Sequence, residues 1–161
     1  MSFDIAALNP SLEQMFYSYV NQDIPHYFFF ILDWKMNRDD TEILLALKEN
    51  RIHGMMLIYK RHIVQLRGTK PAAQELFSRI DLKKIELNTE TEHRDIVREK
   101  HSVVREGELL LMTLRRGEER LAPTDDVIEL KPERAGEIAA LMRSANPEYW
   151  VISVLRESQH R

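Results

Sequence analysis

The sequence predicts an α/β domain with a mixed, largely antiparallel central sheet flanked by helices, and three observations support this. Residues 41–68, TEILLALKENRIHGMMLIYKRHIVQLRG, read as two or three strands with polar turns at Glu49-Asn50-Arg51 and Lys60-Arg61. From there on, strand-like and helical segments alternate, as they do in layered α/β domains. The length of 161 residues is enough for one well-buried core without a disulfide or a metal.

The N-terminal region predicts one helix and one strand. Residues 9–20 suit a helix because Asn9 can cap it, Pro10 fits its first turn, and apolar residues follow at helical spacing. The next run, from Pro25 to Trp34 (PHYFFFILDW), is rich in aromatic and β-branched residues, which favours a buried strand. A polar turn at residues 35–40 is expected to close it.

The strands of residues 41–68 are expected to form the centre of the sheet. Residues 43–47 are apolar on both sides of the strand, so both of its faces should be covered. Gly54 in the second strand predicts a bulge or the close approach of another backbone. Residues 62–66 would add a third strand. Alternation places four residues of the second strand on one face: Ile52, Gly54, Met56 and Ile58.

The rest of the sequence alternates between predicted helices and strands. The expected helices are residues 71–80, a helix that begins at the capping-box residues 89–92 and runs to about position 101, and a helix opened by Pro132. The expected strands are residues 84–87, 108–114 and 127–130.

The composition excludes several classes of protein. Without cysteine there is no disulfide framework, thiol nucleophile or cysteine zinc site, and an intracellular location is expected. The net charge of -3 gives no reason to expect nucleic acid or an anionic membrane as a partner. No signal peptide is recognisable, and no apolar run approaches the ~20 residues that span a bilayer. We therefore expect a cytoplasmic protein.

Two stretches resemble parts of the GNAT N-acetyltransferase family. Residues 127–150, VIELKPERAGEIAALMRSANPEYW, are similar to the opening of many such domains, with a strand, a turn, a helix and an Asn-Pro-x-x-Trp-like end. The hairpin LLALKENRIHGMMLIY resembles the central strand pair of the family. The two stretches together cover a minor part of the chain.

The resemblance implies two lobes and an incomplete cofactor site. Residues 1–122 would be a degenerate N-terminal lobe, and residues 123–161 the start of a second, catalytic lobe. The family motif Arg/Gln-x-x-Gly-x-Gly/Ala lets backbone N–H groups and a helix N-terminus wrap the pyrophosphate of acetyl-CoA. Here the glycines are isolated, at positions 54, 68, 107, 117 and 136. The resemblance therefore implies a chain without a complete acetyl-CoA site and without acetyl transfer activity.

Three functional hypotheses follow. The first is an acetyltransferase-related lobe that serves substrate or partner binding, or dimerisation. The second is a stand-alone ligand-binding or protein-interaction module, whose likeness to acetyltransferases is one of fold. The third is a complete enzyme with an atypical acetyl-CoA loop.

The loop Arg67-Gly68-Thr69-Lys70 is the candidate cofactor-binding site. It should join a strand to a helix, and it offers two cations, a hydroxyl group and a helix N-terminus, which together can hold a phosphate or a carboxylate. The alternative is an ordinary helix start with solvated basic side chains.

The histidines predict no metal site. Strand geometry could bring His53 near His62, but no third histidine or acidic residue follows at ligand spacing. His93 and His101 lie about two turns apart on a predicted helix and have no predicted role.

Two further features have alternative interpretations. Asp33, Asp39 and Asp40 could act as general bases in a pocket that desolvates them, but they are read as a solvated turn. The apolar tail Tyr149–Leu155 either packs on its own core or forms an edge for a partner, so a homodimer through this tail is one expectation.

Overall fold

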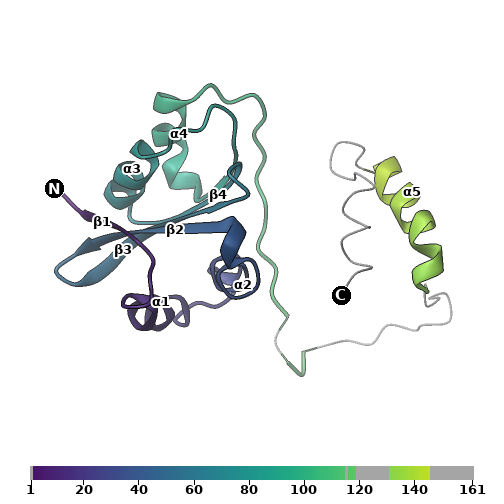
Figure 1. The fold of residues 1–161 in the computed structure, drawn as a ribbon. Helices are drawn as coiled ribbons and strands as arrows, with labels where there is room; N and C mark the ends of the chain where they lie inside the picture. Colours follow the sequence, from purple (N-terminus) through teal and green to yellow (C-terminus); the bar gives the residue numbers. More distant parts are fainter. Residues whose placement is uncertain (1, 115, 119–130, 146–161) are drawn as a thin grey trace. The chain divides into compact units, whose positions relative to one another are not determined.

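The structure is a computed structural model that describes residues 2–114, 116–118 and 131–145 (Figure 1). The chain divides into two compact units, Met1–Thr113 and Leu114–Arg161. The boundary expected between residues 122 and 123 lies outside the described residues.

The first unit contains a five-stranded sheet whose strands are arranged in sequence order. Neighbouring strands are antiparallel, except for the parallel pair β4 and β5. The predicted fold class is confirmed, and the predicted hairpin occupies the middle of the sheet. The strands are β1 (Asp4–Ala7), β2 (Thr41–Lys48), β3 (Arg51–Tyr59), β4 (Ile63–Gly68) and β5 (Glu86–Thr89).

Both hairpin turns form where polar residues interrupt the apolar strands. Glu49 and Asn50 have φ angles of 50° and 59°, and Lys60 and Arg61 have φ angles of 48° and 59°. Two consecutive residues with positive φ give a tight turn whose twist matches that of the flanking strands. These turns set the register of the three central strands.

A bulge lies at His53, as Gly54 suggested. Ala46 pairs with Gly54, but the next residue of β2 pairs with Ile52, so His53 is the extra residue. The extra residue reverses the alternation of side chains at the start of β3. Ile52 therefore packs on the opposite face from Met56, and the predicted shared face for these two residues is wrong.

Helices cover both faces of the sheet, with α1 and α2 on one face and α3 and α4 on the other (Figure 1). Each face buries its own apolar cluster, and full burial of one such side chain contributes about 1.5–3 kcal/mol. Three of the helices confirm predicted helices, although α1 begins after a turn at residues 9–12. The bounds are α1 (Glu13–Val20), α2 (Phe28–Met36), α3 (Lys70–Ser78) and α4 (Arg94–Lys100).

The predicted strand at residues 25–34 is wrong, because these residues form most of helix α2. Phe30 and Trp34 are buried one turn apart, and Tyr27 and Ile31 pack beside them, which is helical spacing. An apolar run on both sides of an element fits a buried strand or a helix equally well. A helix of nine residues covers the sheet here, and the short 3₁₀ turn Arg38–Asp40 leads into β2.

The segment after β5 begins with a 3₁₀ turn, Thr91–His93, and continues into α4. The expected capping box does not form, because the Thr89 side chain contacts His93 Nδ1 instead. Lys100 ties the end of α4 to α3: its ammonium group donates to the carbonyl oxygens of Phe77 and Ile80, both at 2.7 Å. These bonds reach carbonyls in the last turn of α3 and just after it, where helical hydrogen bonding ends.

The predicted strand at residues 108–114 is wrong. These residues have no helix or strand structure, and their apolar side chains are exposed. A strand needs a neighbour for its backbone groups, and no strand of the described residues pairs with this segment.

The second unit contains the 3₁₀ turn η3 (Pro132–Arg134) and helix α5 (Ala135–Ala145), so the predicted helix opened by Pro132 is confirmed. Arg134 and Glu137 form two hydrogen bonds in the first turn, at 2.8 and 2.6 Å. The predicted strand 127–130 and the apolar tail 149–155 lie outside the described residues. Among the helices that the structure describes, none combines the length and apolar character needed to cross a membrane.

Candidate functional site

The loop Arg67-Gly68-Thr69-Lys70 connects the end of β4 to the start of α3, as predicted. Gly68 has φ +121°, and a Cβ added to it would lie 2.3 Å from the Cα of Gly54 and 2.5 Å from the carbonyl oxygen of His53. The bulge at His53 creates this close approach of two backbones. The Thr69 N–H donates to the same His53 carbonyl at 2.9 Å, so the loop is fixed to β3.

Arg67 points toward β5 rather than into solvent. One guanidinium nitrogen donates to the carbonyl oxygen of Asn88 at 3.0 Å, and the other lies 2.5 Å from the Asn88 side-chain oxygen. Burial lowers the pKa of Arg67 from its ordinary value, and the nearby Glu90 carboxylate opposes that shift. The Nε of Arg67 is buried without a hydrogen-bond partner among the described residues. Arg67 therefore holds the parallel pair of strands together.

Glu90 follows β5, and its carboxylate lies close to polar groups from three parts of the fold. Its carboxylate accepts a hydrogen bond from the Gly68 N–H at 3.3 Å, and His26 Nε2 lies 3.2 Å from its other oxygen. His93 Nε2 lies 3.3 Å from the oxygen that Gly68 contacts. We call these four residues, Gly68, His26, Glu90 and His93, the Glu90 cluster.

His93 is fully buried, and its neighbours indicate which ring nitrogen carries a proton. Nε2 lies 3.0 Å from the Gly68 carbonyl oxygen as well as near Glu90, and both of these groups can only accept hydrogen bonds. Nε2 must therefore carry a proton. Nδ1 lies 2.8 Å from the Thr89 hydroxyl, which also donates to the Leu66 carbonyl oxygen at 3.2 Å. Through these contacts His93 connects the end of β4 to the 3₁₀ turn after β5.

The proton on Nε2 of His93 also argues against a metal ion bound between His93 and the neighbouring glutamates. Glu90, Glu92 and His93 have ligand atoms within 4.8 Å of one another, which is compatible with a cation in distance alone. A histidine binds a metal through a nitrogen without a proton, whereas Nε2 of His93 donates to a carbonyl group. The cluster is therefore a hydrogen-bonded one.

Lys70 and Thr69 lie on the exposed side of the loop. Lys70 forms an ion pair with Asp95, and this hydrogen bond lowers the pKa of the Asp95 carboxyl group. A shallow groove of about 560 Å³ runs from Lys70 along the 3₁₀ turn and α4 to Arg98. Thr69 is the N-cap residue of α3 by position, but its side chain makes no capping hydrogen bond.

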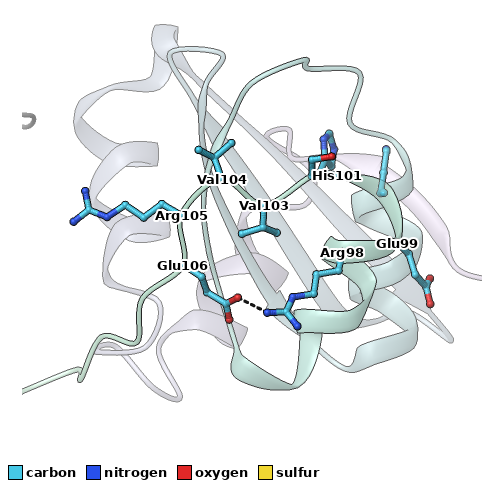
Figure 2. A pocket seen from close by; sticks show the side chains of 9 residues that line it. Arg98, Glu99, His101, Val103, Val104, Arg105 and Glu106 are labelled. Carbon is cyan, nitrogen blue, oxygen red and sulfur yellow. Dashed lines mark hydrogen bonds and ion pairs between the residues drawn. The ribbon is translucent and has the colours of Figure 1, made fainter.

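A second groove, of about 530 Å³, lies away from this loop and is lined by residues 98–106 (Figure 2). Arg98 and Glu106 approach each other at 2.7 Å, and this contact is drawn across the groove in Figure 2. The groove is formed by one continuous segment and contains neither the loop nor the Glu90 cluster. It adds nothing to the chemistry of the candidate site.

The other candidate residues, which are two histidines and three aspartates, do not form a second site. His53 and His62 are at opposite ends of the β3–β4 pair, since Gly54 pairs with Gly68 and Tyr59 with Ile63. Asp33 is buried on α2, where it accepts a hydrogen bond from the Asn37 side chain at 2.9 Å, whereas Asp39 and Asp40 are exposed. The aspartates therefore do not share a pocket.

Sequence reasoning missed three residues of the site, namely His26, Glu90 and His93. The sequence pattern places His26 in a predicted strand and assigns no role to His93. The one available signal is that Glu90 and His93 come shortly after the predicted strand at residues 84–87, just as the candidate loop follows the predicted strand at residues 62–66. The parallel pairing of β4 and β5 was not predictable from local pattern, and this pairing brings the two segments together.

Gly68, His26 and His93 together surround a carboxylate, and the carboxylate that they surround in this structure is that of Glu90. Comparison with protein-family models, with curated proteins and with solved structures gives no match to this chain.

Proposed function

We propose that the chain is a GNAT acetyltransferase-related protein in which the first unit acts as a non-catalytic binding lobe. One observation carries this proposal: the Gly68 N–H donates to the Glu90 carboxylate. A cofactor pyrophosphate would need such donors at the start of α3. Here the chain supplies its own anion, and Arg67 and Lys70 are engaged by Asn88 and Asp95.

The proposal extends to the rest of the chain and to its location. Residues 123–161 would begin a second lobe of the same kind, as the resemblance of residues 127–150 implies. The absence of cysteine from the sequence favours a reducing compartment, so we place the protein in the cytoplasm.

Calorimetric titration with acetyl-CoA, together with a thermal-shift scan, tests the non-catalytic role. We expect neither heat of binding nor a shift in Tm at ~1 mM ligand. A ligand with a Kd of about 10 μM would at that concentration stabilise the folded state by about 2.7 kcal/mol. At about 2–4 °C per kcal/mol for a chain of this size, such stabilisation raises Tm by about 5–11 °C. Binding weakened by Lys70→Ala but not by Lys83→Ala would instead support an enzyme with an atypical loop.

A variant of Glu90 tests the relation to acetyltransferases. If the loop is a cofactor loop closed by Glu90, Glu90→Ala should bind coenzyme A measurably while the unchanged chain does not. Glu92→Ala is the matched control, because it removes a neighbouring exposed carboxylate that does not contact Gly68. Urea denaturation of both variants confirms that they are folded.

A stand-alone interaction module is the second candidate function. The observation that favours it is an exposed apolar face on α2, which has no role in the loop site. If Glu90→Ala is folded and binds no coenzyme A, this candidate replaces the first.

A further inference from the structure

Helix α2 exposes an apolar stripe on the side that faces away from the sheet. Phe28, Leu32 and Met36 follow one another at intervals of four residues and are exposed by 49%, 37% and 59%. Phe29, which is 50% exposed, lies beside them on the same side of the helix. We call these four residues the α2 face.

The fold itself does not account for the α2 face. The inner side of α2 already packs on the sheet through Phe30 and Trp34. A surface helix normally carries polar residues on its outer side, whereas a helix that is apolar all round is normally buried. Contiguous exposed apolar side chains on a folded protein mark an interaction site.

We propose that the α2 face binds the α2 face of a second copy of this chain, with the two helices antiparallel across a two-fold axis near Leu32. This inference deepens the proposed binding role by naming its partner. It depends on α2 alone, so it can fail while the proposal about the Glu90 cluster holds, and the reverse is also true.

The exposed area agrees with what a homodimer needs. Half of a large side chain corresponds to about 100 Å², so the α2 face and the neighbouring Ile24, which is also exposed, offer about 500 Å² per copy. When all of this area is covered, two such faces bury about 1,000 Å², which is the lower limit for a specific interface. A symmetric pair uses the same patch twice and needs no second complementary surface.

The arrangement along the helix also fits antiparallel pairing. Leu32 is the middle residue of the stripe, so a two-fold axis there places Phe28 of one copy opposite Met36 of the other. Antiparallel pairing also opposes the two helix dipoles, which is favourable.

Sedimentation velocity of the full chain over about 1–100 μM tests the proposal. We expect a reversible dimer, and Leu32→Glu should weaken it at least tenfold because the substitution places two carboxylates at the axis. Leu110→Glu is the matched control, since Leu110 is an exposed leucine on a different segment and its variant should dimerise normally. A monomer at every concentration overturns the proposal.

Crosslinking identifies the contacting face. The chain has no cysteine, so Leu32→Cys introduces a single thiol that a short bis-maleimide can join across the axis. We expect Leu32→Cys to crosslink at least tenfold faster than Leu110→Cys. Equal rates, or a dimer that survives Leu32→Glu, would mean that another surface, such as the apolar tail, forms the dimer, and the proposal would be wrong.

Discussion

Strand β2 and residues 108–114 have similar sequences and opposite environments. β2 reads TEILLALK, and the later segment reads ELLLMTL. Leu45 of β2 is fully buried, whereas Leu110 and Met112 are 90% and 87% exposed. The two stretches would be classed together by composition, and both were predicted to be strands.

The presence or absence of neighbouring strands explains why β2 is a buried strand and residues 108–114 are not. β2 has β1 on one side and β3 on the other, and the tight turn at residues 49–50 brings β3 into place. The later segment and the residues just before it are attached to α4 by ion pairs of Arg94 with Glu108 and Glu106. These pairs hold side chains and leave the backbone groups without a neighbouring strand. Apolar composition makes a strand possible, and a partner at the right distance makes it form.

The largest expected effect comes from comparing a glycine of the central sheet, Gly68, with Gly107, which immediately precedes residues 108–114. Gly68→Ala would press a Cβ against the backbone of Gly54 and His53 and would keep a strained positive φ. We expect a loss of about 3–5 kcal/mol in the free energy of unfolding, measured with urea.

Gly107→Ala is the control, because its Cβ would meet nothing within 4 Å. It should change stability by less than about 0.5 kcal/mol. If both alanine variants unfold at the same urea concentration, the contact between Gly68 and Gly54 does not constrain the fold.

An intermediate effect is expected for leucines. Leu45→Ala should cost about 2–5 kcal/mol, because it leaves a cavity between the sheet and α2. Leu110→Ala should change stability by less than about 0.5 kcal/mol, because the side chain is already in water. A large loss for Leu110→Ala would show that residues 108–114 pack as a strand in solution, and the contrast with β2 would disappear.

The smallest effect concerns the ion pairs that attach the later segment to α4. The hydrogen bond from Arg98 holds the pKa of Glu106 below its ordinary value, and Arg94 acts in the same direction. The contact is therefore present above the ordinary glutamate pKa and is lost as pH falls through the lowered one. NMR titration of the Glu106 carboxyl carbon should show the lowered pKa.

Arg98→Ala should raise the pKa of Glu106 toward its ordinary value, and ~1 M salt should do the same by screening the charges. Arg79→Ala removes a different arginine, which pairs with Glu75, and it should leave the Glu106 titration unchanged. An unchanged titration in Arg98→Ala would show that the ion pair does not form in solution.

Local signals predicted a large part of the fold. The polar pairs at residues 49–50 and 60–61 located both hairpin turns, because tight turns require particular residues at particular positions. Helical spacing located α3 and α5, and Gly54 indicated the bulge. The same kind of signal failed at α2, because a run that is apolar on every side has no period to read.

By itself, the sequence determined the order of most elements, the central hairpin, the strand-to-helix position of Arg67–Lys70 and the isolation of every glycine. Tertiary structure decided that α2 is a helix, that residues 108–114 are not a strand, and that β5 runs parallel to β4. The physical reason is the range of the contacts. The turns depend on neighbouring residues, whereas the Gly68 carbonyl and His93 meet across 25 residues of chain. Such a contact exists only after the two strands have paired.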